Sequence, residues 1–126
     1  MSSLTDGAEN RVLDWLTMNS TTAPTTSLKC RLMTANGSDS AAGTEVTGGS
    51  YVSQTVTFAA AASGATSNSG ALTFTDMPSC TVVGVEIWDT NGTPYRWWWG
   101  ALTGNKVVGA GDTFTIAAGD LDLTMA

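Results

Sequence analysis

The chain has 126 residues, five Lys or Arg, eleven Asp or Glu and no His, so its formal net charge is −6. This length fits one domain that buries its own core without a metal or a disulfide. The scarcity of positive charge excludes a nucleic-acid backbone as partner, because such binding needs clustered Lys and Arg, and the absence of His excludes Ser-His-Asp and Cys-His catalysis.

The N-terminal segment TDGAENRVLDWL predicts the one helix of the chain. Asp6 is placed to cap its first turn, with Glu9 three residues later in a capping-box arrangement. The apolar stripe expected to pack against another surface consists of Ala8, Val12, Trp15 and Leu16. Pro24 prevents the helix from continuing, so residues 1–25 are predicted as a helix with an extended arm.

From Leu28 onward the apolar residues recur with a period of two, which is typical of antiparallel strands. The predicted strands lie in LKCRLM, SYVSQTVTF, ALTFT, TVVGVEIW, YRWWWGAL, TFTI and LDLTM. In SYVSQTVTF, Val52, Val56 and Phe58 share a face and Tyr51 lies opposite, whereas the Ala/Ser/Gly tract 59–70 is predicted as a loop or thin edge. Residues 26–126 are therefore predicted as a single mainly β domain, an antiparallel sandwich of jelly-roll or immunoglobulin-like type.

Turn residues separate these strands. Asn91-Gly92 predicts a hairpin that pairs TVVGVEIW with YRWWWGAL, and AGD at 110–112 recurs at 118–120 as two turns of the same chemistry. Turn formation is also the interpretation for the aspartates that neighbour loop residues, namely Asp39, Asp76, Asp89, Asp112 and Asp120.

The three consecutive tryptophans raise the question of which face of a strand each one occupies. Alternation predicts that Tyr95, Trp97 and Trp99 line the core and that Arg96 and Trp98 lie outside. On the partner strand Val83, Val85 and Ile87 are expected to face inward, with Val82, Gly84, Glu86 and Trp88 facing outward.

Arg96 then approaches Glu86 or Trp88 across the pair, as an ion pair or a cation–π contact. Glu86, Trp88, Arg96 and Trp98 are therefore candidates for a protein-interaction patch, since indoles and Arg are enriched in such patches. A solvated sheet face and a sugar-stacking platform are the alternatives. On the patch hypothesis, Trp98→Ala weakens self-association or docking rather than folding.

No catalytic or cofactor site is predicted. Glu86 with Asp89, or Asp120 with Asp122, would supply paired carboxylates, but nothing else marks either pair as a glycosidase site. No known calcium-binding motif is present, so no metal is expected. Cys30 and Cys80 are interpreted as small buried apolar residues, with a disulfide left open.

The chain shows no signal-peptide pattern and no apolar run of 18 residues. It is therefore expected to be made in the cytoplasm as a soluble protein without membrane contact.

An ordered series of motifs covers almost the whole chain: LTDGAENRVLDWL, GTEVTGGSY at Gly43 to Tyr51, QTVTF, GVEIWD, WWGALT and GDTFTIAAGDLDLT. In this order they resemble a family of tailed-bacteriophage virion structural proteins of about 120 residues, of tail-fibre-like or head-decoration-like type. The resemblance implies a non-enzymatic protein located in the virion.

Within that class, a small acidic β domain without a fibrous shaft favours a capsid decoration (cement) protein that stabilises the outer shell. The partners expected are the major capsid protein or other virion proteins and further copies of the chain. The N-terminal helix, with Trp15, is predicted to dock on one of them, and removal of residues 1–25 is predicted to prevent incorporation while leaving a folded domain. The alternative is a small tail, collar or fibre component that contacts host glycans.

Overall fold

A computed structural model describes residues 2–19 and 26–125. In chain order the elements are β1 (Ser2–Leu4), α1 (Asp6–Leu16), β2 (Leu28–Ala35), β3 (Thr44–Glu45), β4 (Gln54–Val56), β5 (Ala65–Ser67), β6 (Leu72–Phe74), β7 (Cys80–Trp88), β8 (Arg96–Val108), β9 (Phe114–Ile116) and β10 (Asp122–Thr124). All strand pairs are antiparallel, which confirms the predicted mainly β fold with one short helix near the N-terminus.

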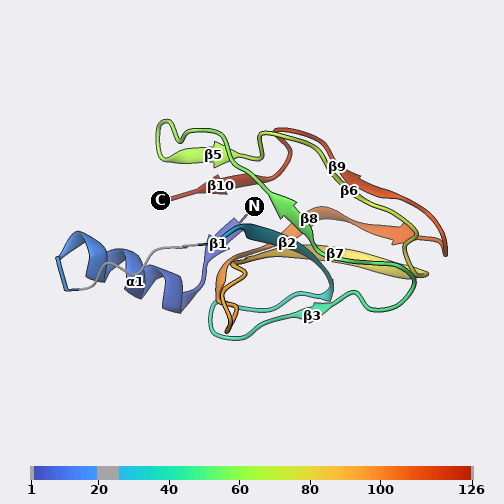
Figure 1. Cartoon of the computed structure of the whole chain (residues 1–126), viewed down its shortest axis with the longest axis horizontal. Coiled ribbons are helices and arrows are strands. Elements are labelled where there is room, and N and C mark those ends of the chain that lie inside the picture. The colour runs from blue at the N-terminus through green and yellow to red at the C-terminus, as the bar shows by residue number, and fades with distance from the viewer. Residues whose placement is uncertain (1, 20–25, 126) are drawn as a thin grey trace.

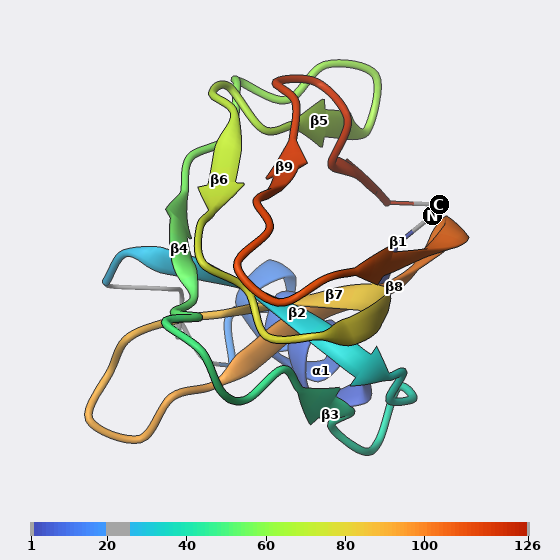
Figure 2. The same cartoon turned by 90° about the vertical axis from the view of Figure 1, so that its right-hand side faces the viewer.

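The strands form two layers (Figure 1). A six-stranded sheet has the order β1-β8-β7-β2-β3, with β4 also paired to β2. Two short pairs, β6 with β9 and β5 with β10, lie across one face of this sheet, and α1 lies on the opposite side (Figure 2). We call the side that faces the short pairs the core face, and the side that faces α1 the outer face.

The core lies between the two layers because the apolar side chains of both converge there. Cys30 and Leu32 of β2, Val85 and Ile87 of β7 and Phe74 of β6 belong to one buried cluster. The alternation predicted for β2 and for Val85 and Ile87 is therefore confirmed. The prediction is wrong at the start of β7: Val82, expected on the outer face, is in the core, and Val83, expected in the core, is half-buried outside that cluster. The register between β7 and β8 shifts between Val82 and Gly84, which accounts for this exchange.

The N-cap of helix α1 lies one residue earlier than predicted. Thr5 is the N-cap, and its hydroxyl oxygen accepts a hydrogen bond from the Ala8 amide at 3.2 Å. Asp6 is the first helical residue, so the predicted capping box with Glu9 is wrong. Thr5 is preferred because its hydroxyl also donates to the Arg96 carbonyl at 2.9 Å, which ties the helix start to β8.

The N-terminal residues before the helix were not predicted as a strand. Ser2–Leu4 pair with Gly100, Trp99 and Trp98 at the edge of the six-stranded sheet. Residues 1–25 therefore contribute a strand to the sheet as well as a helix. The interpretation of Pro24 as a helix stop lies outside the described residues.

The middle of the chain differs in detail from the predicted strand SYVSQTVTF. Only Gln54–Val56 is a strand, Val52 is exposed, and Tyr51 packs against the core through its ring, which stacks on Phe74 at 6.0 Å between centroids. The prediction that Tyr51 lies on the opposite face from Val56 is wrong, since both side chains contact the core. Tyr51 precedes the strand and so does not follow its alternation of faces. The tract 59–70 contains the short strand β5, paired with β10.

The predicted turns of the C-terminal half are confirmed. Gly111 and Gly119, the glycines of the two AGD segments, have φ angles of 82° and 86°, and in each turn the Asp amide donates to the carbonyl three residues earlier. Asp112 also accepts the Gly109 amide through its carboxylate at 3.0 Å. The two AGD segments therefore form turns with the same glycine conformation and the same backbone hydrogen bond.

Both cysteines are free thiols. Cys30 is fully buried in the core, and this burial raises the pKa of its thiol to about 12. Cys80 is half-buried at the start of β7. The interpretation of Cys30 as a small buried apolar residue is confirmed.

Candidate functional site

The predicted interaction between Glu86 and Arg96 exists, but it is buried. Arg96 Nη1 lies 3.3 Å from Glu86 Oε1, and the two residues are 9% and 1% exposed. The same oxygen accepts the Gly43 amide at 2.8 Å, and Glu86 Oε2 accepts the indole N–H of Trp88 at 2.9 Å. A buried ion pair persists only where its remaining hydrogen-bonding capacity is filled, as it is here.

This ion pair lies under the loop of residues 36–43. Arg96 Nη2 donates to the carbonyl oxygens of Ser38 at 2.6 Å and Asp39 at 3.2 Å. The Asp39 carboxylate accepts the indole N–H of Trp99 at 2.6 Å, and its carbonyl accepts the Asp6 amide at 3.1 Å. Asp39 therefore joins the loop, the sheet and the helix. From the sequence Asp39 is assigned only to a turn, because its partners Asp6, Arg96 and Trp99 are all more than 30 residues away in the chain.

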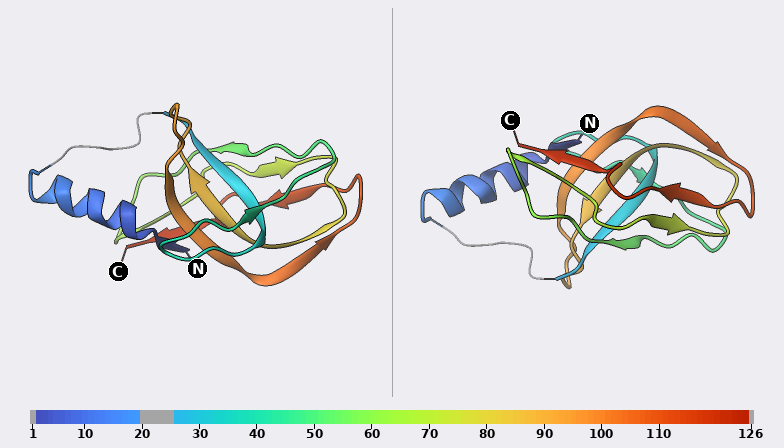
Figure 3. Two further views of the ribbon diagram at one scale, coloured as in Figure 1. Left: turned by 90° about the horizontal axis from the view of Figure 1, so that it is seen from below. Right: turned by 90° about the horizontal axis from the view of Figure 1, so that it is seen from above.

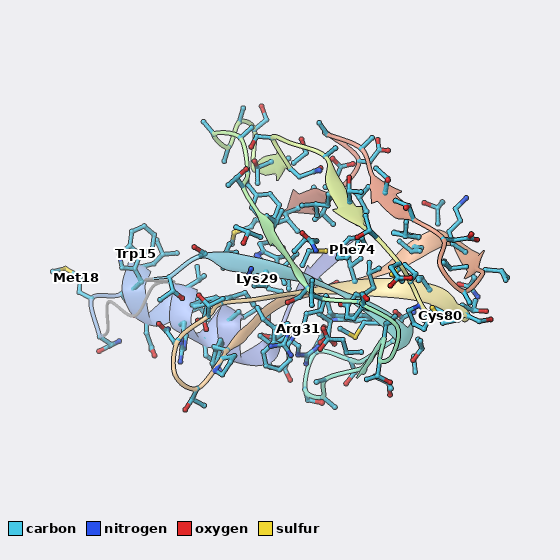
Figure 4. All side chains as sticks on the ribbon, turned by 45° about the vertical axis from the view of Figure 1, so that its right-hand side comes forward. Trp15, Met18, Lys29, Arg31, Phe74 and Cys80 are labelled. Atoms are coloured by element: carbon cyan, nitrogen blue, oxygen red, sulfur yellow. The ribbon has the colours of Figure 1, made fainter. Side chains whose placement is uncertain are left out.

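A guanidinium does lie over Trp88, but it belongs to Arg31. Its Cζ is 4.3 Å from the centroid of a Trp88 ring, and Arg31 also pairs with Glu45 at 3.6 Å. Arg31 reaches this position because it lies opposite Glu86 in the register of β2 and β7 (Figure 4 labels Arg31). The prediction that Arg96 reaches Trp88 or Glu86 is thus met at Glu86, while the cation–π contact has a different donor. We call Glu86 and Arg96 the buried polar layer; half-buried Trp88 and Arg31 and exposed Asp39 surround it.

The faces predicted for the tryptophans are inverted. Trp98 lies opposite Ile87 and packs against the core, while Trp99 lies opposite Glu86 on the outer face. Trp97 is 6% exposed, outside the core cluster, and its indole N–H donates to Asp89 at 3.1 Å.

The cause of the inversion is a β-bulge between Ile87 and Trp88, where β8 has one extra residue, Trp97. Simple alternation would place Arg96 and Trp98 on one face, as the sequence suggested. The extra residue leaves Trp98 in the core and lets Arg96 reach Glu86 on the outer face. Trp98 is therefore not an exposed patch residue.

Asp89, at the end of β7, is a buried carboxylate that sequence reasoning assigned correctly to a turn. Its Oδ1 accepts the amides of Asn91 and Tyr95 at 3.3 and 2.9 Å. Its Oδ2 accepts the Asn91 side-chain amide and the Trp97 indole. Glu86 and Asp89 thus use both carboxylate oxygens to hold protein donors, which gives them a structural role.

Trp15 differs from the other candidates because it is exposed. Of the predicted apolar stripe only Ala8 is buried, near the start of α1. Arg11 stacks on Tyr95 at 3.5 Å, and beyond it the helix leaves the sheet, as both views of Figure 3 show. The apolar residues at its far end are Leu13 (59% exposed), Trp15 (60%), Leu16 (64%) and Met18 (91%). We call these four residues the helix tip; Figure 4 labels Trp15 and Met18 there.

Two depressions in the described part of the chain are lined by residues of β8. One of about 470 Å³ lies between β8 and the β9–β10 segments and includes Asp120, Asp122, Lys106 and Phe114. The other, of about 420 Å³, lies where the helix start, the 36–43 loop and the start of β8 meet.

Within residues 2–19 and 26–125, no three His, Cys, Asp or Glu side chains gather in a way that would hold a metal ion. In the same ranges, no helix has both the length and the apolar character that crossing a membrane requires.

Comparison with known families gives one match. The family model described as "Podophage GP4 fiber I protein gp80" matches residues 3–124. A search of curated proteins gives no match.

Proposed function

The chain belongs to the podophage GP4 fiber I protein gp80 family, which is a family of phage virion structural proteins, and from this premise we propose that it is a fibre component of a podophage virion. The match spans almost the whole chain, so the family's printed description refers to this domain rather than to an attached module. It favours the fibre alternative over capsid decoration, which stays a prediction from the sequence.

The fibre proposal rests on this match, and the observation that supports docking to another virion protein is the helix tip. Large apolar side chains that lie exposed together on an element projecting from a domain usually mark an interface, since their exposure stabilises nothing in the isolated protein. Here three such side chains lie in the last turn of α1 and Met18 follows just after it, while the only buried residue of that helix is Ala8 in its first turn. We therefore assign the helix tip the docking role that the sequence predicted for Trp15.

A helix presented in this way fits a groove on another virion protein. Leu13 and Leu16 are three residues apart and so share one side of α1, which is the spacing that groove-binding helices use. The last turn carries no basic residue, while Asp14 lies within it. A groove with an apolar floor and a neutral or basic rim suits this helix end.

The experiment replaces two helix-tip residues in the phage and measures incorporation. Trp15→Ser with Leu16→Ser should reduce the amount of this protein in purified particles at least tenfold, quantified by mass spectrometry against the major capsid protein. Val107→Ser is the matched control, because Val107 is 86% exposed on β8, far from α1 in sequence. Normal incorporation of the double variant would overturn the docking role.

Deletion of residues 1–25 is a poorer test than the sequence suggested. It removes β1 from the sheet and takes away the Thr5 hydroxyl that bonds the Arg96 carbonyl. Failure to enter particles would then follow from a damaged fold, whereas the double variant leaves β1 and Thr5 intact.

Location within the particle separates a fibre component from a decoration protein. Gold-labelled antibody against the chain should mark appendages on intact particles. Label spread over the whole capsid surface would overturn the fibre proposal and support decoration. The homo-oligomer predicted from the sequence is checked separately by light scattering of the purified protein.

A further inference from the structure

The depression of about 420 Å³ at the helix start has a lining that sequence reasoning could not assemble. Trp88 and Arg96 come from the ends of β7 and β8, Tyr95 from the residue before β8, Asp39 and Ser40 from the 36–43 loop and Asp6 from the first turn of α1. Small-molecule sites have volumes of about 300–1,000 Å³ and combine apolar walls with a few polar groups that fix orientation. The depression is shallow and open to solvent, but its volume lies in this range and its lining combines two aromatic rings with several polar groups.

Two aromatic rings form part of its wall, and each is held by an arginine. Trp88 is half-buried, with Arg31 over its ring and its indole N–H bonded to Glu86. Tyr95 is half-buried, with the Arg11 guanidinium 3.5 Å from its ring centroid. Each guanidinium covers one face of its ring, and a ring held in this way offers its remaining exposed surface at little entropic cost.

Polar groups surround these rings. Asp39, Ser40 and Asp6 are exposed and supply two carboxylates and one hydroxyl. Asp39 Oδ1 holds the Trp99 indole, but a carboxylate offers about four acceptor positions, so one such bond leaves it able to accept more. These are the acceptors that the hydroxyl groups of a ligand require.

The local charge selects the class of ligand. Arg96 is nine-tenths buried and already paired with Glu86, so it offers no unbalanced positive charge. Asp6 and Asp39 bring two negative charges to the rim against the one positive charge of Arg11 on Tyr95, so the net local charge is negative and disfavours phosphates and other anions. An uncharged ring with one apolar face and several hydroxyl groups is compatible with both the rings and the carboxylates.

We propose that this depression binds a neutral pyranose, with a face of the sugar against Trp88 or Tyr95 and its hydroxyl groups donating to Asp39 and Asp6. A sugar-stacking platform is one of the alternatives left open by the sequence, and the structure places carboxylates from two segments distant in the chain, Asp6 and Asp39, in the same depression as Trp88. The depression lies at the start of α1, whereas the helix tip lies at its end. The sugar-binding proposal and the docking proposal can therefore be tested independently, and failure of one does not imply failure of the other.

The test is a titration of the full chain with four neutral sugars: methyl α-D-glucopyranoside, methyl α-D-galactopyranoside, N-acetyl-D-glucosamine and methyl α-L-rhamnopyranoside. Each is added to about 50 mM, well above a millimolar dissociation constant, which corresponds to about −4 kcal/mol. At least one should shift the NMR signals of the Trp88 indole and the Ser40 amide. Absence of a shift with all four overturns the proposal.

A rim variant tests the location, since Trp88→Ala removes a partner of buried Glu86 and risks unfolding. Ser40→Arg places a long side chain at the exposed rim and should weaken binding at least tenfold. Ser79→Arg, at an exposed position before β7, is the matched control and should bind as the unmodified chain does. Unchanged binding by Ser40→Arg overturns the assignment.

A third titration distinguishes a sugar from a basic protein segment. Tetralysine carries positive charge that the acidic rim would attract but no pyranose ring. If tetralysine shifts the Trp88 indole signal and none of the sugars does, the depression receives a cationic segment and the proposal is wrong.

Discussion

The buried polar layer and the helix tip are opposite in chemistry and in exposure. In the polar layer Glu86 and Arg96 are almost fully buried, and each charged group has several partners within hydrogen-bond distance. In the helix tip Trp15 and Met18 are apolar and mostly exposed. The first arrangement holds the loop and the helix start to the sheet, whereas the second contributes little to folding. Stability and docking are therefore expected to respond to different residues.

The largest effect is expected from breaking the polar layer at Arg96. Arg96→Met leaves the Glu86 carboxylate buried without its cation, so the free energy of unfolding should fall by about 3–5 kcal/mol, as measured by urea denaturation. Lys106→Met removes an exposed positive charge and should change this free energy by less than about 0.5 kcal/mol. Equal values for the two variants would show that the layer does not stabilise the fold.

Trp98 tests which side of β8 faces the core. Trp98→Ala should lower the free energy of unfolding by about 2–4 kcal/mol, somewhat below the cost at a fully buried site because Trp98 is half-buried. A change below about 0.5 kcal/mol with weakened self-association would restore the exposed-patch interpretation drawn from the sequence.

Thr5 lies at the boundary between the two regions. Thr5→Ala removes both the N-cap of α1 and the hydroxyl that bonds the Arg96 carbonyl, so a loss of about 1–2 kcal/mol and less helical circular dichroism are expected. Thr5→Ser keeps the hydroxyl and should retain most of the stability. If Ser and Ala behave alike, the helix start is held by other contacts.

The smallest effect on folding is expected at the helix tip. Trp15→Ala should change the free energy of unfolding by less than about 0.5 kcal/mol, since the side chain is 60% exposed. The same substitution type at Trp98 provides the direct comparison. A loss at Trp15 as large as that at Trp98 would mean that α1 packs in solution in a way that the structure does not show.

The bulge at Trp97 is the clearest limit of sequence reasoning. Alternation placed Arg96 and Trp98 together, and one extra residue in β8 separated them. The local sequence does not predict such a bulge, because the bulge depends on how the residues of β8 align with those of β7. Strand register also explains why Arg31, rather than Arg96, lies over Trp88. The pairing of β2 with β7 brings Arg31 to that position, and this pairing cannot be read from the local sequence.

The sequence by itself determined whatever depends on neighbours in the chain: the helix, the apolar face of β2, the Asn91-Gly92 hairpin and the turns that carry Asp89 and Asp112. Periodicity and turn chemistry act over a few residues and so can be predicted locally. Only the tertiary structure decided which tryptophan enters the core, that Glu86 and Arg96 are buried, and that Asp39 meets Trp99. Those outcomes depend on strand register and on contacts between segments some 60 residues apart, which no local pattern encodes.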